Sequence, residues 1–370
     1  MFSENKLSAQ IAPVFHYLVF YYGENQSPEN DRMFTSKTQI ARSLIDAGVK
    51  PEEARTIAEH ARSAVQLIPQ HVKNEESVPL GVTKIGGKPD LPQGMEWPWR
   101  PAYPEDANCM AGFRERATRT VDEWHWGTPE QRMENCEYAK RELYAVENTF
   151  PLSFIAQINF AEMWATGEMD EDLPREGMLF LFYDLSVQPW GFDPKENVGF
   201  SVRYHSSGER LIRREIPEEL PWLYNGDMGA IFTCDVAWKL SPLEYETAQW
   251  ELSGLSDETG KMIYDWRLEH EDAPAHQVGG WSSAIQGDMQ VKCALVSAGH
   301  YCGSGDVYEA PELALLRATA TEWLLLAQID SDENGDGWMW GDCGRLYLWI
   351  KRSDLIARRF ERAQLIQQCF

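Results

Sequence analysis

The sequence AQIN at residues 156–159, followed by GMLFLFY at 177–183, is echoed by AQID at 327–330 and GRLYLWI at 344–350. In each half, a short apolar run ends in Asn or Asp, and a glycine then opens a longer apolar run. Apolar runs of this length, bounded by Gly, Asn and Asp, favour buried strands. Because both halves carry these elements in the same order, the sequence predicts two copies of one supersecondary unit in a single body.

A double glycine precedes each copy, at residues 86–87 and at 279–280. Glycine adopts positive φ without steric cost, so both pairs indicate tight turns. Predicted strands follow one another through short turns, while helices gather at the N-terminus and in insertions. This order is typical of the α+β class with antiparallel or mixed β-sheets. We therefore predict an N-terminal helical segment at 1–77 and an internally duplicated α+β domain at 78–370, with copies at about 78–190 and 276–350.

Two helices are predicted before the first copy. Ser36 is a suitable N-cap for a helix that ends near Gly48. Pro51, followed by two glutamates, is typical of the first turn of a second helix. Apolar side chains recur at helical spacing from Ala54 to Val65, so we expect this second helix to extend to Val65 and to dock on the body through that face.

The 370 residues carry a formal net charge of −24. A field of this sign repels phosphates and anionic lipids, so we expect no direct nucleic-acid binding and no membrane association, and it favours basic partners. The seven cysteines are odd in number and form no CxxC pair, which is typical of reduced thiols. The first residues do not resemble a signal peptide, and we expect a cytoplasmic protein.

The sharpest local pattern is DSDENGDG at 330–337. Oxygen-bearing side chains at its first, third, fifth and seventh positions, with glycine at the sixth, resemble the start of an EF-hand calcium loop. The twelfth position, which should be a bidentate glutamate, is Gly341, and the preceding residues predict a strand. A turn between strands explains the pattern, because Asp, Asn and Gly favour turns. We predict no metal site, and a calcium-dependent element at Asp330–Asp336 is kept as an alternative.

Common catalytic motifs are absent from the sequence, including those of nucleotide-binding loops, zinc proteases and α/β-hydrolases, so no catalytic residue and no cofactor are predicted. His300 and Cys302 could pair an imidazole with a thiolate in a glycine-rich loop. His270 and His276 flank two carboxylates and could contribute to a metal cluster. Neither spacing is specific, because the residues of such sites meet through the fold rather than along the chain.

Two acidic stretches are the candidate partner-binding surfaces. Solvated faces explain such charge runs, but carboxylates beside exposed aromatic residues also suit recognition of a basic protein. Charge then steers the encounter, and aromatic anchors supply affinity. Both interpretations stay open. The candidate partner-binding residues are Asp330, Asp332, Asp336, Trp338, Trp340, Asp342, Glu168, Asp170, Glu171 and Asp172.

Several blocks of the sequence resemble the YwqG-like family, also known as the DUF1963 domain. The blocks are GGKPDLP at 86–92, WP at 97–98, PLSFIAQI at 151–158, HQVGG at 276–280, IQGDM at 285–289, LLAQIDSD at 325–332 and WGDCGRLYLWI at 340–350. The resemblance covers roughly residues 78–368. It implies a duplicated α+β body in a bacterial family of unknown biochemical activity. It also implies a candidate immunity role, because members are found beside secreted toxins. The long insertion between Arg100 and Asn148 departs from the family pattern.

We therefore expect a cytoplasmic protein-binding module, and specifically an immunity protein that neutralises a cognate antibacterial toxin such as a nuclease. Nucleases have basic surfaces because they must hold phosphates, and an acidic protein can occlude such a surface. The alternative is an enzyme or small-ligand-binding protein with a cleft between the two copies. The candidate residues for that cleft are Gln157, His276, Gln286, Gln328 and the His300/Cys302 loop.

Overall fold

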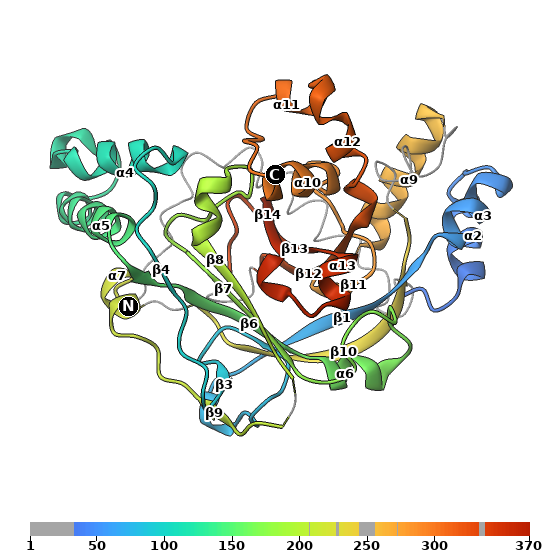
Figure 1. Ribbon diagram of the computed structural model, residues 1–370, viewed down its shortest axis with the longest axis horizontal. Helices are drawn as coiled ribbons and strands as arrows, with labels where there is room; N and C mark the ends of the chain where they lie inside the picture. Colours follow the sequence, from blue (N-terminus) through green and yellow to red (C-terminus); the bar gives the residue numbers. More distant parts are fainter. Residues whose placement is uncertain (1–32, 207, 227–228, 244–255, 272, 333–336) are drawn as a thin grey trace.

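The computed structural model describes residues 33–206, 208–226, 229–243, 256–271, 273–332 and 337–370. Its main element is a ten-stranded sheet, in which all pairings between described strands are antiparallel (Figure 1). Helices lie around the sheet and in the segments between strands. The predicted α+β class with antiparallel pairing is confirmed. Within the described ranges, no helix combines the length and the apolar character that crossing a bilayer requires.

From one edge to the other, the strands of the large sheet are β14 (Gln364–Gln368), β13 (Arg345–Lys351), β12 (Trp323–Asp330), β11 (Gln277–Gly279), β1 (Arg62–His71), β10 (Phe232–Ser241), β2 (Lys84–Ile85), β6 (Ser153–Asn159), β7 (Met178–Tyr183) and β8 (Phe200–His205). Two small sheets pair β3 (Asp90–Pro92) with β9 (Leu211–Arg213), and β4 (Trp99–Arg100) with β5 (Phe150–Pro151).

The described α-helices are α2 (Lys37–Asp46), α3 (Pro51–Glu59), α4 (Asn108–Thr118), α5 (Pro129–Glu147), α6 (Phe160–Thr166), α7 (Glu219–Leu223), α9 (Asp257–His270), α10 (Gln290–Ser297), α11 (Asp306–Glu309), α12 (Ala314–Arg317) and α13 (Arg352–Ile356). Short 3₁₀ turns are η2 (Glu75–Ser77), η3 (Val121–Glu123), η4 (Pro194–Gly199), η5 (Pro311–Leu313), η6 (Ala320–Glu322) and η7 (Phe360–Arg362).

The large sheet has the same arrangement on both sides of its central strands β1 and β10. Outward from the centre lie β2, β6, β7 and β8 on one side, and β11, β12, β13 and β14 on the other. Both AQI strands carry an irregularity at the same place, between Phe154 and Ala156 in β6 and between Leu325 and Ala327 in β12. The strands predicted from the echoed sequence are therefore present and occupy matching positions.

The N-terminal region differs from its prediction in one respect. Ser36 caps α2 as expected, with its hydroxyl accepting from the Gln39 N–H. Helix α3 begins at Pro51 but ends at Glu59, and the residues from Arg62 onward form β1 at the centre of the sheet. The helical spacing of apolar side chains continues to Val65, beyond the end of α3. In β1, Ala64, Val65 and Leu67 are all buried. Because successive side chains of a strand point to opposite faces, the burial of both Ala64 and Val65 means that both faces of the sheet are covered at this place.

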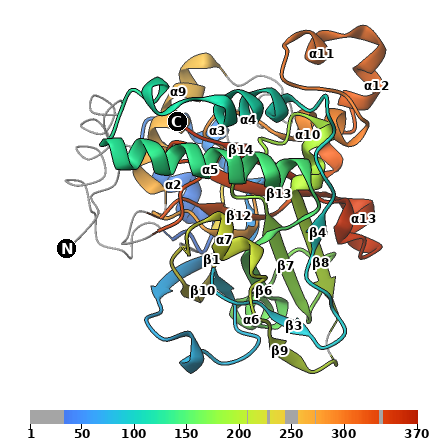
Figure 2. The same cartoon turned by 90° about the vertical axis from the view of Figure 1, so that its left-hand side faces the viewer.

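One apolar core joins the two halves of the sheet. It contains Ile155 and Leu179 from the first half and Leu326 and Leu346 from the second. Outside this core, α4 and α5 lie together as a separate layer at one end of the molecule, with α7 beside them (Figure 2). The inserted segment between Arg100 and Asn148 therefore forms an outer surface of its own.

Candidate functional site

The first double-glycine turn is held by Gln157, which lies on β6 with its side chain fully buried. Its Nε2 donates to the Val82 carbonyl at 2.8 Å, and its Oε1 accepts from the Asp90 N–H at 2.8 Å. Gly86 and Gly87 lie between these two contacts with φ of +75° and +73°. A Cβ at Gly86 would lie 2.2 Å from a backbone oxygen, so only glycine fits there.

The second turn is held by Gln328 in the same way. Its Nε2 donates to the Ala275 carbonyl at 2.5 Å, and its Oε1 accepts from the Ser283 N–H at 3.0 Å. Gly279 and Gly280 lie between these contacts with φ of +69° and +76°. Both glutamines therefore satisfy buried backbone groups rather than line a ligand cleft.

Asp330 belongs to a buried charged cluster. Its Oδ1 accepts from Arg345 Nε at 2.8 Å, its Oδ2 accepts from the Ala275 N–H at 2.7 Å, and Arg345 Nη1 donates to Glu271 Oε1 at 2.6 Å. Burial raises the pKa of Asp330 above its usual value, and Arg345 opposes that rise. Burial also acts to raise the pKa of Glu271, but the positive charges of Arg345 and Arg267 outweigh it, and that pKa lies below its usual value.

His276 lies beside this cluster and is also buried. Its Nδ1 accepts from the Asp330 N–H at 2.9 Å. Burial, together with the charge of Arg345, lowers the pKa of His276 to about 3, so the imidazole is neutral at physiological pH. The cluster of Asp330, Glu271, His276 and Arg345 is thus a structural support for the turn. Among the described residues, no group of three or more His, Cys, Asp and Glu side chains is arranged to hold a metal ion.

The turn after Asp330 does not present its tryptophans to solvent. Trp338 is 6% exposed and Trp340 is 0% exposed. Their rings stack with centroids 5.5 Å apart, and their indole N–H groups donate at 3.0 Å to the carbonyls of Ala230 and Asp330 respectively. The prediction that Trp338 and Trp340 are exposed aromatic anchors is therefore wrong, because both are core residues. Apolar area and a satisfied indole N–H make this burial favourable.

The other predicted residues of this turn differ in accessibility. Asp332 is buried like Asp330, and its N–H donates to the Trp338 carbonyl at 2.9 Å. Asp336 lies outside the described residues, and Asp342 is partly exposed. Of the described acidic residues in this turn, Asp342 is thus the one with a side chain that reaches solvent.

The second predicted surface is the acidic connector, residues 168–176, between α6 and β7. Asp170 and Asp172 both pair with Arg352 of α13, and the Asp170 Oδ2 to Arg352 Nη2 distance is 3.1 Å. Glu168 and Glu171 are exposed. The connector therefore joins the first half of the protein to the second, and two of its four candidate carboxylates remain on the surface.

The residues of the predicted cleft are not brought together around a shared opening. Gln157, Gln328 and His276 are buried in the two turns, while Gln286 is exposed. Cys302 is buried, and its Sγ lies 3.6 Å from the backbone oxygen of His300 rather than against the imidazole. Burial raises the pKa of the Cys302 thiol, which disfavours a nucleophilic thiolate.

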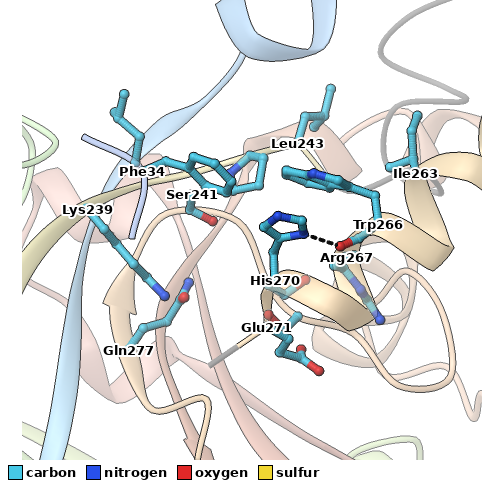
Figure 3. A pocket seen from close by; sticks show the side chains of 14 residues that line it. Phe34, Lys239, Ser241, Leu243, Ile263, Trp266, Arg267, His270, Glu271 and Gln277 are labelled. Carbon is cyan, nitrogen blue, oxygen red and sulfur yellow. Dashed lines mark hydrogen bonds between the residues drawn. The ribbon is translucent and has the colours of Figure 1, made fainter. Parts of the chain in front are cut away.

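A pocket with polar and aromatic walls lies between α9 and the ends of β10 and β11 (Figure 3). The rings of Trp266 and His270 stack with centroids 4.9 Å apart, and Phe34 stacks on both. Lys239 and Gln277 form the opposite wall. The free volume is only about 60 Å³, which suits a few water molecules rather than a substrate. This pocket therefore gives little support to an enzymatic function.

An exposed aromatic surface lies instead on α5 and α7. Tyr144 is 56% exposed and Trp222 is 44% exposed, and their ring centroids are 5.8 Å apart in an edge-to-face arrangement. Arg141 fixes α7 against α5, because its Nη1 donates to the Trp222 carbonyl at 2.6 Å and to Asn225 Oδ1 at 2.7 Å. We call Tyr144 and Trp222, with the exposed Met133 of α5, the α5/α7 surface.

Exposed carboxylates accompany this aromatic surface. Glu134 and Glu137 project from α5, and Glu218 and Glu219 lie at the start of α7. The sequence analysis did not select these residues. The sequence indicates an exposed face of α5, because Met133, Glu137, Lys140 and Tyr144 follow one another at helical spacing. The contact of Trp222 with this face depends on the fold.

A family model described as a domain of unknown function, DUF1963, matches residues 83–369. The chain belongs to the DUF1963 family. No curated protein matches the sequence. The match begins close to the first double-glycine turn and ends just after the last strand. It therefore contains both turns and all strands of the large sheet except β1.

Proposed function

We propose that this DUF1963 protein is a protein-binding module for a basic protein, and that it acts in the cytoplasm as an immunity protein for a cognate antibacterial toxin. The observation that carries the proposal is the α5/α7 surface, where an exposed aromatic pair lies on two helices that also carry exposed carboxylates. Tyr and Trp are enriched among the hot-spot residues that supply most of the binding energy of protein interfaces.

The α5/α7 surface is suited to binding because it is organised before the partner arrives. The Arg141 contacts hold Trp222 beside Tyr144, so little side-chain freedom is lost on association. The net charge of −24 favours approach of a basic surface and disfavours approach of an acidic one. A nuclease toxin has the required positive surface, because it must bind phosphates.

The partner-binding residues predicted from the sequence that reach solvent are proposed as secondary contacts with the same partner. Glu168 and Glu171 on the acidic connector and Asp342 beyond the buried tryptophans contribute negative charge without an aromatic anchor. Charges of this kind act on the association rate and its salt dependence more than on the stability of the complex.

Co-expression tests the proposal. The product of the gene beside this one, as the candidate toxin, is expressed in cells with the wild-type protein, with Tyr144→Ala/Trp222→Ala, or with Tyr301→Ala as a matched control. Tyr301 is 43% exposed and lies in the loop between α10 and α11, away from the α5/α7 surface. We expect survival with the wild type and the control, and death with the double variant.

The complex is measured in parallel by sizing chromatography and calorimetry. Removing one aromatic anchor from an interface weakens the free energy of binding by about 2 kcal/mol, which raises Kd about 30-fold. The double variant should lose more binding free energy than that. Binding should also weaken at high salt. Absence of both protection and a complex at low salt would rule out the immunity role, whereas a complex that Tyr144→Ala/Trp222→Ala leaves unchanged would move the interface elsewhere.

We also infer that the two outer parts of the sheet derive from one internally duplicated unit. The support comes from the matching strand order and from the equivalent contacts of Gln157 and Gln328. In both halves, the carbonyl that accepts from the glutamine lies four residues before the first glycine, and the N–H that donates to it lies four residues after that glycine.

A further inference from the structure

A cavity of about 140 Å³ lies where the acidic connector crosses the second half of the sheet. The connector provides one wall, and β12, β13 and α13 provide the other. The side chains that line it are predominantly apolar, and Met169, Leu173, Leu324, Leu326, Ile350 and Leu355 form most of its interior. All six of these side chains are buried in the folded protein.

The cavity exists partly because of Gly279, which lies at the second double-glycine turn. A Cβ at this position would lie 3.4 Å from Met169 Cε and 3.9 Å from Leu173 Cδ1. The missing side chain therefore leaves space next to the connector. The space is open to solvent at its mouth, so it is a recess in the surface with buried side chains in its walls rather than an internal void.

The mouth of the cavity has a different character from its interior. Arg62, Ser63 and Asp170 line the opening and are partly exposed. Asp170 is paired with Arg352, and the Arg62 guanidinium stacks on Trp281 with its carbon 3.3 Å from the ring centroid. Polar groups are thus confined to the rim, while the depth of the cavity offers hydrophobic contact alone.

We propose that this cavity binds one small, uncharged apolar molecule, of about the size of benzene. An enclosed apolar protein cavity of about 150 Å³ accepts benzene or xenon. The space here is comparable, and its interior has no charged group to compensate an ionic ligand. The site lies between the connector of the first copy and the strands of the second, and it uses none of the residues that form the α5/α7 surface.

Methyl-resolved NMR with benzene as the probe tests the proposal on the full chain. Benzene should produce saturable shifts of the Met169 and Ile350 methyl resonances and raise the thermal midpoint. The methyl groups of Leu315, which is 86% exposed and far from the cavity in the fold, should not shift. Absence of saturable shifts in the wild-type protein would overturn the proposal.

Two cavity-filling variants separate specific binding from general solvent effects. Leu173→Phe and Met169→Phe each place a larger side chain on the connector, whose outer contacts with Arg352 lie at the surface. In either folded variant, the Kd for benzene, measured from the shifts of the Ile350 methyl resonances, should be at least tenfold higher than in the wild type. If both variants fold and bind benzene as tightly as the wild type, the probe occupies another place and the cavity is not the site.

Discussion

The double-glycine turns of the two halves are supported by the same backbone contacts but by different side-chain chemistry. In the first half, Thr83 Oγ1 accepts from the Asn159 N–H at 3.0 Å. In the second half, His276 Nδ1 accepts from the Asp330 N–H at 2.9 Å. The equivalent position therefore holds a neutral hydroxyl in one half and a titratable imidazole in the other, so the requirement is a hydrogen-bond acceptor rather than a particular residue.

The buried charges near the two turns differ as well. In the first half, Asp90 pairs with Arg213 at 2.9 Å and lies 3.9 Å from Lys84, so two cations share this carboxylate. In the second half, Arg345 contacts both Asp330 and Glu271. In the first arrangement two cations lie against one carboxylate, and in the second one cation, Arg345, makes direct ion pairs with two carboxylates.

The largest difference between the halves should appear when these cations are removed. Arg345→Met leaves Asp330 and Glu271 buried without their shared cation, and should lower the free energy of unfolding by about 3–5 kcal/mol. Lys84→Met should lower the free energy of unfolding by clearly less. Asp90 keeps its ion pair with Arg213, and Glu75, the other partner of Lys84, keeps its hydrogen bond from the Lys88 N–H. Urea unfolding of both variants measures the difference. Equal losses would mean that the charged clusters of the two halves are equally dependent on one side chain.

The second prediction concerns pH. The pKa of His276 is about 3 in the folded protein and about 6.5 in an unfolded chain. Between these values the unfolded state binds more protons, so stability falls as the pH drops from about 6.5 towards 3. His276→Thr copies the acceptor of the first half and removes this titration. Between pH 7 and pH 5 the wild type should lose about 2 kcal/mol more than the variant.

This pH comparison is made as a difference, because other charged groups face the imidazole. Asp330, Glu271 and Arg345 are present in both proteins, so most of their contribution cancels. Thermal or urea unfolding at each pH provides the measurement. Parallel stability curves for the wild type and His276→Thr would show that His276 does not carry the acid sensitivity of the second half.

What the sequence predicted correctly was mostly local. The AQI and GxL strands and the helix cap at Ser36 follow from hydrophobic periodicity and from the chemistry of turns and helix caps. The end of the second helix was not predictable in the same way, because the helical spacing of apolar residues continues to Val65 although the helix ends at Glu59.

Contacts that join distant segments were missed. Trp338 stands in an acidic turn, which indicated exposure, yet the carbonyl that its indole N–H meets belongs to Ala230, 108 residues away. Tyr144 and Trp222 likewise become one surface only when α7 packs against α5. Local composition shows where charge is concentrated, but the three-dimensional fold determines which aromatic residues remain accessible beside it.

The smallest predicted effect concerns the contact between the halves. Arg352 joins α13 to Asp170 and Asp172 of the connector, but its side chain is 44% exposed, so water and salt weaken these ion pairs. Arg352→Ala should lower the free energy of unfolding by less than about 1 kcal/mol, and the difference should nearly vanish at about 1 M salt. Urea unfolding at low and high salt measures this difference.

Because apolar side chains from both halves share one core, we expect this core rather than the surface ion pairs to hold the halves together. A loss comparable to that of Arg345→Met would contradict this expectation and identify the connector as a principal joint of the molecule.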